Sequence, residues 1–441
     1  MTRQAAPVSP PVVCSIAGSD SGGGAGIQAD TKTIEADDAF ATTAITSVTA
    51  QNTQGVRDVS TLTPETVRAQ IDAVLDDFDV QAVKTGMLAT SEIVETVADY
   101  GPNLPSLVVD PVMVASSGDR LLDEDAEAAY DDLLAAATLV TPNTDETTVL
   151  TGIEVTDAET ARRAGEALID RGVDAALVKG GHVPGDAVVD TLVTEDSVHT
   201  YRHDRIDTDA THGSGCTLSS AIATRLAHGD DLPTAVGEGI ALLSRAVRYN
   251  VDVGAGPGAV HHTVDVRNEA ARDETVEAVE HVVAGLREAD ATALVPRGVT
   301  NVVGTTPYAE SAADVAAVDG GIGRTRDGLR PNRGVRFGVE TPLVEVVLAA
   351  RERDPAVRFG LTCTATPAVV DALAGLDETV ATVTASERER QVDRAFDETA
   401  ARPAAIVDDH GDRLFLLAST PEDVLSQIRT IVASVDDYSN N

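Results

Sequence analysis

The chain is poor in aromatic residues and in lysine. Of its 441 residues only 3% are aromatic and none is tryptophan, so its apolar cores have to be built from Val, Ala, Leu and Ile. Lysine occurs only at Lys32, Lys84 and Lys179, and the other 30 of the 33 basic residues are arginine. Because lysine is so nearly excluded, each of these three residues needs a specific reason to be there.

Positive charge as a whole is also scarce. The formal net charge of -39 would repel nucleic acid and anionic membranes over most of the surface. Excess acid with little lysine is typical of cytoplasmic proteins adapted to high salt, where counterions screen the self-repulsion. No run of about 18 apolar residues is present, as a membrane-spanning helix would need. We therefore expect a cytoplasmic, halophilic protein with no nucleic-acid or membrane partner.

Cysteine is rare and widely spaced. Cys14, Cys216 and Cys363 form neither a C-x-x-C knuckle nor an even-numbered disulfide framework. They are expected to be reduced thiols, and the length of the chain favours two domains.

Alternating apolar runs and helix-like stretches occupy residues 12–265. This pattern predicts βαβ units and a doubly wound, mainly parallel sheet flanked by helices, with residues 190–193 and 199–202 as an antiparallel pair. Glycine and proline at 254–258 interrupt the pattern, and the following His261-His262 is expected to be a solvated domain end. A linker helix over 266–291 and a second C-terminal α/β domain over 292–435 are expected to follow.

A glycine-rich segment, Thr211-His212-Gly213-Ser214-Gly215-Cys216, precedes an apolar helix-like run. Glycine lets the backbone approach an anion, and the N–H groups of a first helical turn point at it along the positive end of the helix dipole. The segment therefore predicts an anion site with a thiol beside it. A tight turn before a buried structural cysteine is the alternative.

Further polar residues follow other apolar runs, where ligands bind in doubly wound sheets. Asp20 lies in a glycine-rich turn and suits a substrate hydroxyl or amine, although a flexible turn explains it equally well. Asp110 and Glu146 offer the carboxylate oxygens that a Mg²⁺-nucleotide requires. Asn143 and Glu146 also have the spacing of a capping box. Lys179, before two glycines, could reach a phosphate as a point charge.

These segments, in this order, resemble the ribokinase-like superfamily and, within it, the hydroxymethylpyrimidine and phosphomethylpyrimidine kinases of thiamine biosynthesis. The resemblance covers roughly residues 12–265 and rests on seven motifs, which are AGSDSGGGAGIQADTKT (17–33), TAQNTQGV (49–56), VKTGML (83–88), DPVMVASSGDRLL (110–122), TPNTDE (141–146), VKGGH (178–182) and THGSGCTLSSAIA (211–223).

The resemblance implies ATP-dependent phosphorylation, with Mg²⁺, of 4-amino-5-hydroxymethyl-2-methylpyrimidine and then of its monophosphate. Pyridoxal or pyridoxine is the alternative substrate, and a homodimer is expected. The implied site residues fall into four groups: Gln51, Asp20, Gly18 and Met87 for the pyrimidine; Lys179, Asn143 and Gly181 for ATP; Asp110 and Glu146 for the metal; and Gly213, Ser214 and Gly215 as the anion hole, with Cys216 as general base. The helix N-terminus is expected to lower the pKa of the thiol.

The C-terminal region resembles the archaeal thiamine-phosphate synthase domain found fused behind such kinases. Its arginines cluster at positions 324, 326, 330, 333 and 336, which suggests a phosphate-binding face or scattered surface pairs. Relatives typically have F-G-x-S-x-H where this chain has Phe337-Gly338-Val339-Glu340-Thr341-Pro342, so the histidine is absent. The segment 361–364 departs too. Synthase activity and binding of thiamine phosphates without turnover therefore both stay open.

Overall fold

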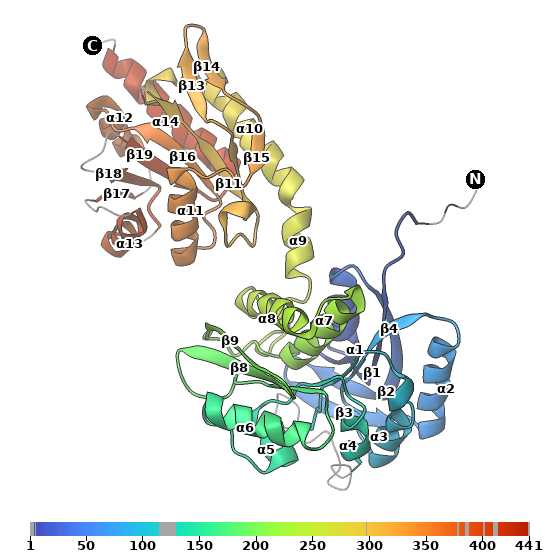
Figure 1. Ribbon diagram of the computed structural model, residues 1–441. Helices are drawn as coiled ribbons and strands as arrows, with labels where there is room; N and C mark the ends of the chain where they lie inside the picture. Colours follow the sequence, from blue (N-terminus) through green and yellow to red (C-terminus); the bar gives the residue numbers. More distant parts are fainter. Residues whose placement is uncertain are drawn as a thin grey trace. The chain divides into compact units, whose positions relative to one another are not determined.

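The computed structural model describes residues 4, 6–113, 129–296, 298–376, 379–383, 388–399, 402–408 and 413–439 (Figure 1). The chain forms two compact units, residues 1–266 and 267–441. One segment noted in the sequence, 114–122 of the DPVMVASSGDRLL motif, lies outside the described residues. Among the described helices, none is long and apolar enough to cross a membrane.

The first unit is built on a nine-stranded sheet in the order β3-β2-β1-β4-β5-β6-β7-β8-β9. The strands from β2 through β1 and β4 to β7 run parallel, and β3, β8 and β9 add antiparallel edges. The strands are β1 Val12–Asp20, β2 Phe40–Asn52, β3 Gly55–Thr61, β4 Val80–Thr85, β5 Leu107–Val109, β6 Leu139–Val140, β7 Ala175–Val178, β8 Ala187–Thr194 and β9 Val198–Asp204.

Helices cover both faces of this sheet because its central strands are apolar on both sides. Along β5, Leu107 and Val109 face the core made with α2, α3 and α4, whereas Val108 faces the core made with α1, α7 and α8. The helices of this unit are α1 Gly26–Ala36, α2 Pro64–Leu75, α3 Ser91–Ala98, α4 Tyr130–Leu134, α5 Thr144–Thr151, α6 Ala158–Ile169, α7 Ser214–His228 and α8 Leu232–Arg248. A short 3₁₀ helix covers Gly101–Asn103, and α9 (Val264–Ala270) runs across the boundary between the units. The doubly wound α/β architecture is confirmed.

The second unit is also mixed α/β. Its seven-stranded sheet has the order β15-β12-β11-β16-β19-β18-β17, and β10, β13 and β14 form a smaller sheet. The strands are β10 Val299–Thr300, β11 Val302–Thr305, β12 Val315–Val318, β13 Ile322–Thr325, β14 Gly328–Pro331, β15 Val335–Phe337, β16 Phe359–Thr364, β17 Val380–Val383, β18 Ala405–Asp408 and β19 Arg413–Ala418. The helices are α10 Arg272–Glu288, α11 Pro342–Arg353, α12 Pro367–Ala372, α13 Arg388–Glu398 and α14 Pro421–Ser439, with 3₁₀ turns at Ala291–Leu294, Ala312–Asp314 and Leu373–Gly375.

Two expectations about the segment between the units need correction. Helix α10, expected as part of a linker over 266–291, buries Val279, Val282 and Leu286 in the core of the second unit, so it belongs to that unit. His261 and His262, expected to be solvated, are each only 5% exposed. The His262 ring is buried because it packs on α7, where its Nδ1 lies 2.9 Å from the Thr217 hydroxyl.

Candidate active site

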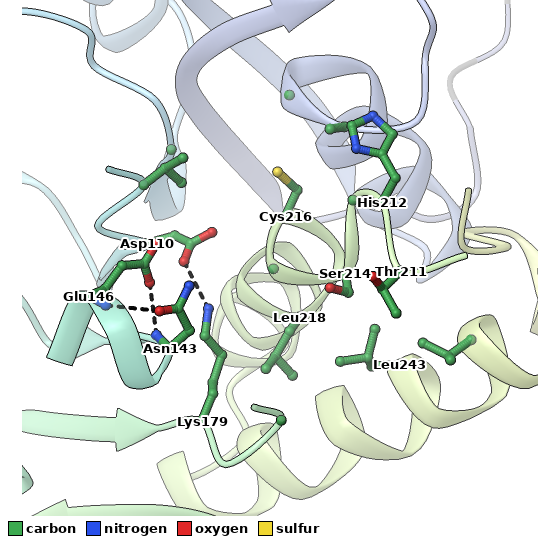
Figure 2. A pocket seen from close by; sticks show the side chains of 18 of the residues that line it. Asp110, Asn143, Glu146, Lys179, Thr211, His212, Ser214, Cys216, Leu218 and Leu243 are labelled. Atoms are coloured by element: carbon green, nitrogen blue, oxygen red, sulfur yellow. Dashed lines mark hydrogen bonds and ion pairs between the residues drawn. The ribbon is translucent and has the colours of Figure 1, made fainter. Parts of the chain in front are cut away.

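One cavity of about 610 Å³ lies in the first unit, beyond the carboxyl ends of the parallel strands. Figure 2 shows its wall between the first turn of α7 and the loops that carry Asp110, Asn143 and Lys179. All of the site residues expected from the sequence line this cavity: Gly18, Asp20, Gln51, Met87, Asp110, Asn143, Glu146, Lys179, Gly181, Gly213, Ser214, Gly215 and Cys216.

The first turn of α7 presents free backbone donors to the cavity. Gly213 is the N-cap residue and has a φ of 84°. A Cβ added there would lie 1.8 Å from the carbonyl oxygen of Gly24, so only glycine allows this close approach. Among the described residues, no acceptor is found for the N–H groups of Gly215 and Cys216. Unpaired donors at the positive end of a 15-residue helix form an anion site.

A lysine and a carboxylate lie opposite this turn. The Lys179 Nζ donates to Asp110 Oδ1 over 3.3 Å (Figure 2). The hydroxyl of Thr141 donates to the same oxygen over 3.2 Å. A Cβ on Gly215 would lie 3.3 Å from Asp110 Oδ2 and 3.6 Å from Lys179 Nζ. The space in front of Gly215 is therefore bounded by backbone donors on one side and an ammonium on the other.

The loop after β7 is held so that Lys179 points into the cavity. The Gly180 N–H donates to Asp190 Oδ1 over 2.8 Å, and a side chain at this glycine would collide with the Val189 carbonyl. Arg205 donates to the carbonyl oxygens of Gly181, Val183 and Gly185. Neither Asp190 nor Arg205 was expected in the site, because their role depends on the antiparallel β8–β9 edge.

Asn143 and Glu146 form a complete capping box at the start of α5. The Asn143 side chain accepts from the Glu146 N–H, and Glu146 Oε2 accepts from the Asn143 N–H at 2.8 Å. Burial, and next to it the charge of Asp110, raises the pKa of Glu146 to about 7, although the charge of Lys179 opposes the rise. Both Asn143 and Glu146 thus have a structural task, whichever ligand reaches them.

The carboxylates suit a metal that arrives with a phosphate ligand. No group of three or more His, Cys, Asp or Glu residues suited to a metal is found in the described part of the chain. Mg²⁺ is usually held by one or two carboxylates together with substrate phosphates and water, rather than by a protein cage. Asp110 and Glu146 provide such a pair, so their chemistry fits a nucleotide-borne Mg²⁺.

Asp20 organises the glycine-rich turn after β1. Its Oδ1 accepts from the Gly22 N–H, and its Oδ2 accepts from the N–H groups of Gly24 and Ala25. His212 Nε2 lies 3.1 Å from the same Oδ2. Burial opposes ionisation, but these hydrogen bonds outweigh it and hold the pKa of Asp20 below its ordinary value. One carboxylate oxygen is thus fully engaged by the protein.

Gln51 and Met87 lie on the same side of the cavity as this turn. The Gln51 amide lies 3.3 Å from His212 Nε2 and accepts from the Thr49 hydroxyl, so His212 contacts both Asp20 and Gln51. The Gly18 N–H donates to the Met87 carbonyl, and a Cβ on Gly18 would overlap the Met87 methyl group. His212 is therefore a site residue that the motif contained but that the sequence assigned no role.

Cys216 projects from the first turn of α7 and is only partly buried (Figure 2). The expected lowering of its pKa is wrong. Burial and the charges of Asp30 and Asp110 raise the pKa of the thiol to about 11, against the opposing effects of Lys84 and the Gly26 N–H. The helix N-terminus does not decide the ionisation, because burial of the sulfur, reinforced by two nearby carboxylates, outweighs it, and the resting residue is a thiol.

In the second unit the arginine cluster is only partly paired. Arg333 and Arg336 both reach Asp319 Oδ2, at 3.0 and 2.9 Å. Arg324, Arg326 and Arg330 are exposed on the β13–β14 hairpin. The structure thus shows surface pairing for two of the arginines and leaves the phosphate-binding interpretation as a prediction.

Comparison with known proteins separates the two units. The family model "Phosphomethylpyrimidine kinase" matches residues 20–261, and the model "Thiamine-phosphate synthase ThiN" matches residues 278–430. The hydroxymethylpyrimidine/phosphomethylpyrimidine kinase of Streptomyces coelicolor is 48% identical over 265 residues, which cover 59% of this chain and 98% of the relative. The Bacillus subtilis enzyme of the same name is 42% identical over 259 residues, or 57% of this chain and 95% of the relative.

Solved structures with the same fold are also kinases. An ADP complex of Bacillus subtilis pyridoxal kinase is 31% identical with a TM-score of 0.55, covering 58% of this chain and 98% of that one. Staphylococcus aureus pyridoxal kinase with AMP-PCP and pyridoxal is 29% identical with a TM-score of 0.54, covering 58% and 95%. Together with the cavity at the carboxyl ends of a ribokinase-like sheet, these matches show that the chain belongs to the phosphomethylpyrimidine kinase family.

Proposed function

We propose that the first unit transfers phosphoryl groups from ATP to 4-amino-5-hydroxymethyl-2-methylpyrimidine and then to its monophosphate. The observation that carries this proposal is the space in front of Gly215, where two free backbone N–H groups face the Lys179–Asp110 pair. Donors that surround a transferring phosphoryl group stabilise the charge on its oxygens, which is the main catalytic requirement of a loose transition state.

The substrate half of the site is assigned to Gly18, Asp20, Gln51 and Met87. Gln51 would read the polar edge of the pyrimidine, and Met87 would pack on its ring. His212 would help to orient Gln51, since its ring lies between that amide and Asp20. Because the carboxylate of Asp20 is already held by three backbone N–H groups, its main contribution is to shape the turn.

The nucleotide half is assigned to Lys179, Asn143 and Gly181. Lys179 would place its charge on the transferred phosphoryl group, while the capping box fixes the turn that carries Asn143. Asp110 and Glu146 would hold Mg²⁺, which, when bound, neutralises charge on the nucleotide phosphates. These assignments rest on the shared cavity and on the motifs.

Cys216 would take the proton of the substrate hydroxyl in the first transfer. The second transfer has less need of a base, because the accepting phosphate oxygen is already ionised. Cys216→Ala is therefore expected to slow formation of the monophosphate more than formation of the diphosphate. Equal small losses in the two rates would show that Cys216 has a structural role and is not the base.

The test of the kinase proposal is ATP-dependent product formation by the full chain at high salt. Chromatography of the pyrimidine products should show the monophosphate first and the diphosphate later. A protein that forms neither would refute the proposal. The same assay with pyridoxal and pyridoxine tests the alternative that the solved relatives suggest. Preference for pyridoxal would reassign the substrate.

The second unit is proposed to act on, or bind, thiamine-related phosphates, following its family match. Glu340 and Pro342 stand where relatives typically have serine and histidine, so catalysis and sensing make different predictions. Supplying the full chain with pyrimidine diphosphate and thiazole phosphate should yield thiamine phosphate if the unit is a synthase. Calorimetric binding of thiamine phosphate without product formation would assign it to sensing.

We further propose a cytoplasmic, salt-adapted homodimer whose kinase domain spans about 12–265 and whose C-terminal domain, expected over 292–435, also includes α10. Sedimentation at molar KCl tests the dimer, and a purely monomeric chain would refute it. Limited proteolysis tests the boundaries, with cleavage expected between the two compact units.

A further inference from the structure

Lys84 is a fully buried lysine at the end of β4. Its side chain is 0% exposed, and its Nζ donates to Asp30 Oδ1 over 2.8 Å. Within the described residues Asp30 is its one hydrogen-bond partner, although an ammonium carries three donors. Burial by itself would lower the pKa of Lys84, but the charges of Asp30 and Asp110 and the hydrogen bond to Asp30 together outweigh it, so the group stays an ammonium. This buried cation therefore keeps donors to spare, and it lines the cavity.

Asp30 connects the Lys84 ammonium to the face of α7 that carries Cys216 and Ser220. The Ser15 hydroxyl donates to Asp30 Oδ2 over 2.6 Å, and the Ser220 hydroxyl donates to Oδ1 over 2.8 Å. Ser220 follows Cys216 by four residues, so the two side chains lie on the same face of the helix, one turn apart. Because Lys84 and Ser220 share one carboxylate oxygen, the ammonium lies along the face from which the Cys216 sulfur projects.

Resting on the proposed kinase activity, we propose that Lys84 is a positioning residue for the first phosphoryl transfer, in which its buried ammonium stabilises the thiolate of Cys216. The negative charge of Asp30 determines how strongly the Lys84 ammonium stabilises this thiolate. The field of a surface charge would be screened by water and salt, but the Lys84 side chain is fully buried, so its field is screened less.

The step balances as follows in atoms and charge. Cys216 first loses its S–H proton to solvent, and Lys84 offsets the resulting negative charge. The thiolate then takes the hydroxyl proton while the substrate oxygen forms a bond to the γ-phosphorus of ATP and the bond from that phosphorus to the ADP oxygen breaks. The products are the pyrimidine monophosphate, ADP and the Cys216 thiol.

The charged groups around the sulfur come from four elements, one of which is the end of β7, where the Lys179 ammonium also interacts with the charge of Cys216. Lys84 on β4 lowers the pKa of the thiol, while Asp30 on α1 and Asp110 after β5 raise it. The Gly26 N–H at the start of α1 also lowers it. Removing the Lys84 ammonium and removing the Asp30 carboxylate must therefore shift the pKa of the Cys216 thiol in opposite directions, although each change breaks the same ion pair.

Alkylation by iodoacetamide as a function of pH measures this ionisation directly in the full chain, because the thiolate is the reactive form. Cys14 and Cys363 are 2% and 0% exposed, so Cys216 supplies the fast-reacting thiol, with Cys216→Ser as the blank. Lys84→Met should slow alkylation at pH 8, and Asp30→Asn should accelerate it, by about tenfold for each pKa unit moved.

Opposite shifts in the two variants would support the proposal, and any other pattern would overturn it. A purely structural ion pair predicts shifts of the same sign, since both variants loosen the same contacts. If Lys84→Met does not fold, Lys84→Met combined with Asp30→Asn leaves no unpaired buried charge and should alkylate more slowly than Asp30→Asn alone. If it does not, the proposal again fails.

The pH profile of the first transfer provides a second readout. In Asp30→Asn the rising limb for monophosphate formation should move to lower pH, while the profile for diphosphate formation should not move. Alkylation needs no substrate, so its outcome judges Lys84 even if the chain phosphorylates neither pyrimidine. Conversely, kinase activity with unshifted alkylation would refute the role of Lys84 and leave the kinase proposal standing.

Discussion

Gly215→Ala should distinguish the contribution of Gly215 to the anion site from its contribution to the stability of the fold. Gly215 lies in the first turn of α7, its φ is not positive, and the nearest atoms to an added Cβ are the Asp110 carboxylate at 3.3 Å and Lys179 Nζ at 3.6 Å. The methyl group would therefore enter the space assigned to the phosphoryl group, after only a small shift of a side chain. It would not collide with the backbone.

The expected effects on stability and on activity have opposite signs. Replacing a helical glycine by alanine favours folding by up to about 1 kcal/mol, so the melting temperature should stay level or rise. A methyl group that displaces the phosphoryl group from its preorganised donors should cost about 3 kcal/mol of transition-state stabilisation, or a factor of 10²–10³ in kcat. Thermal melting and initial rates of monophosphate formation measure the two effects on the same sample.

Two matched variants serve as controls for Gly215→Ala. Gly237→Ala on α8 adds a methyl that meets Tyr201 at an ordinary 3.6 Å outside the cavity, so activity should be unchanged. Gly213→Ala places a Cβ 1.8 Å from the Gly24 carbonyl at a φ of 84°, so it should lower the melting temperature as well as activity. Near-normal activity in Gly215→Ala would show that the phosphoryl group does not pass in front of this residue.

Three further predictions follow from the charges of the protein. Folding raises the pKa of Glu146 from 4.5 to about 7, so the folded state binds more protons between these values and the free energy of unfolding falls as pH rises through them. Glu146→Gln, which keeps a capping-box residue, should remove this fall, worth on the order of 3 kcal/mol, in urea titrations at pH 5 and 8; an unchanged pH dependence would contradict the assignment. Lys179→Met should reduce kcat/KM for ATP by about 10²-fold or more in steady-state assays, and a change below threefold would remove this lysine from the phosphate site. The melting temperature should rise from 0.1 to 1 M KCl, as the screening length shrinks from about 10 to about 3 Å, whereas a flat profile would refute salt adaptation.

The alternation of apolar runs was enough to predict the parallel part of the sheet and the helices on both faces. It missed β3, Gly55–Thr61, because most residues of this edge strand are exposed and show no apolar alternation. Helix α5 was noted only through its capping box, since eight residues with four threonines carry little helical periodicity. The local pattern of apolar residues thus predicts elements that bury one face, and it misses elements that are held in place by other segments of the same protein.

The site was predicted well in location but less well in chemistry. Motifs at successive strand ends identified residues that do share one cavity. The ionisation of Cys216 could not be inferred from its helix position, because it depends first on burial and then on Lys84, Asp30 and Asp110, which reach it from elements far away in the sequence. The burial of His262 likewise could not be inferred from the local sequence, since its partner Thr217 precedes it by 45 residues. The scarcity of lysine and the VKTGML motif were the sequence signals that pointed to Lys84.

The last stretch of the first unit has a consequence for how the protein is made. The Gly256 N–H donates to the Thr53 hydroxyl beside Gln51, the Val251–Ala259 bridge holds the loop, and His262 packs on the first turns of α7. Residues near the end of this unit therefore support, from outside, the walls of a cavity whose lining runs from residue 17 to residue 247. Because domains fold largely as they emerge during synthesis, the kinase site is completed only once residue 262 has left the ribosome. By then translation of the second unit is already under way, so a nascent chain stalled before this point would carry the sheet without a finished site.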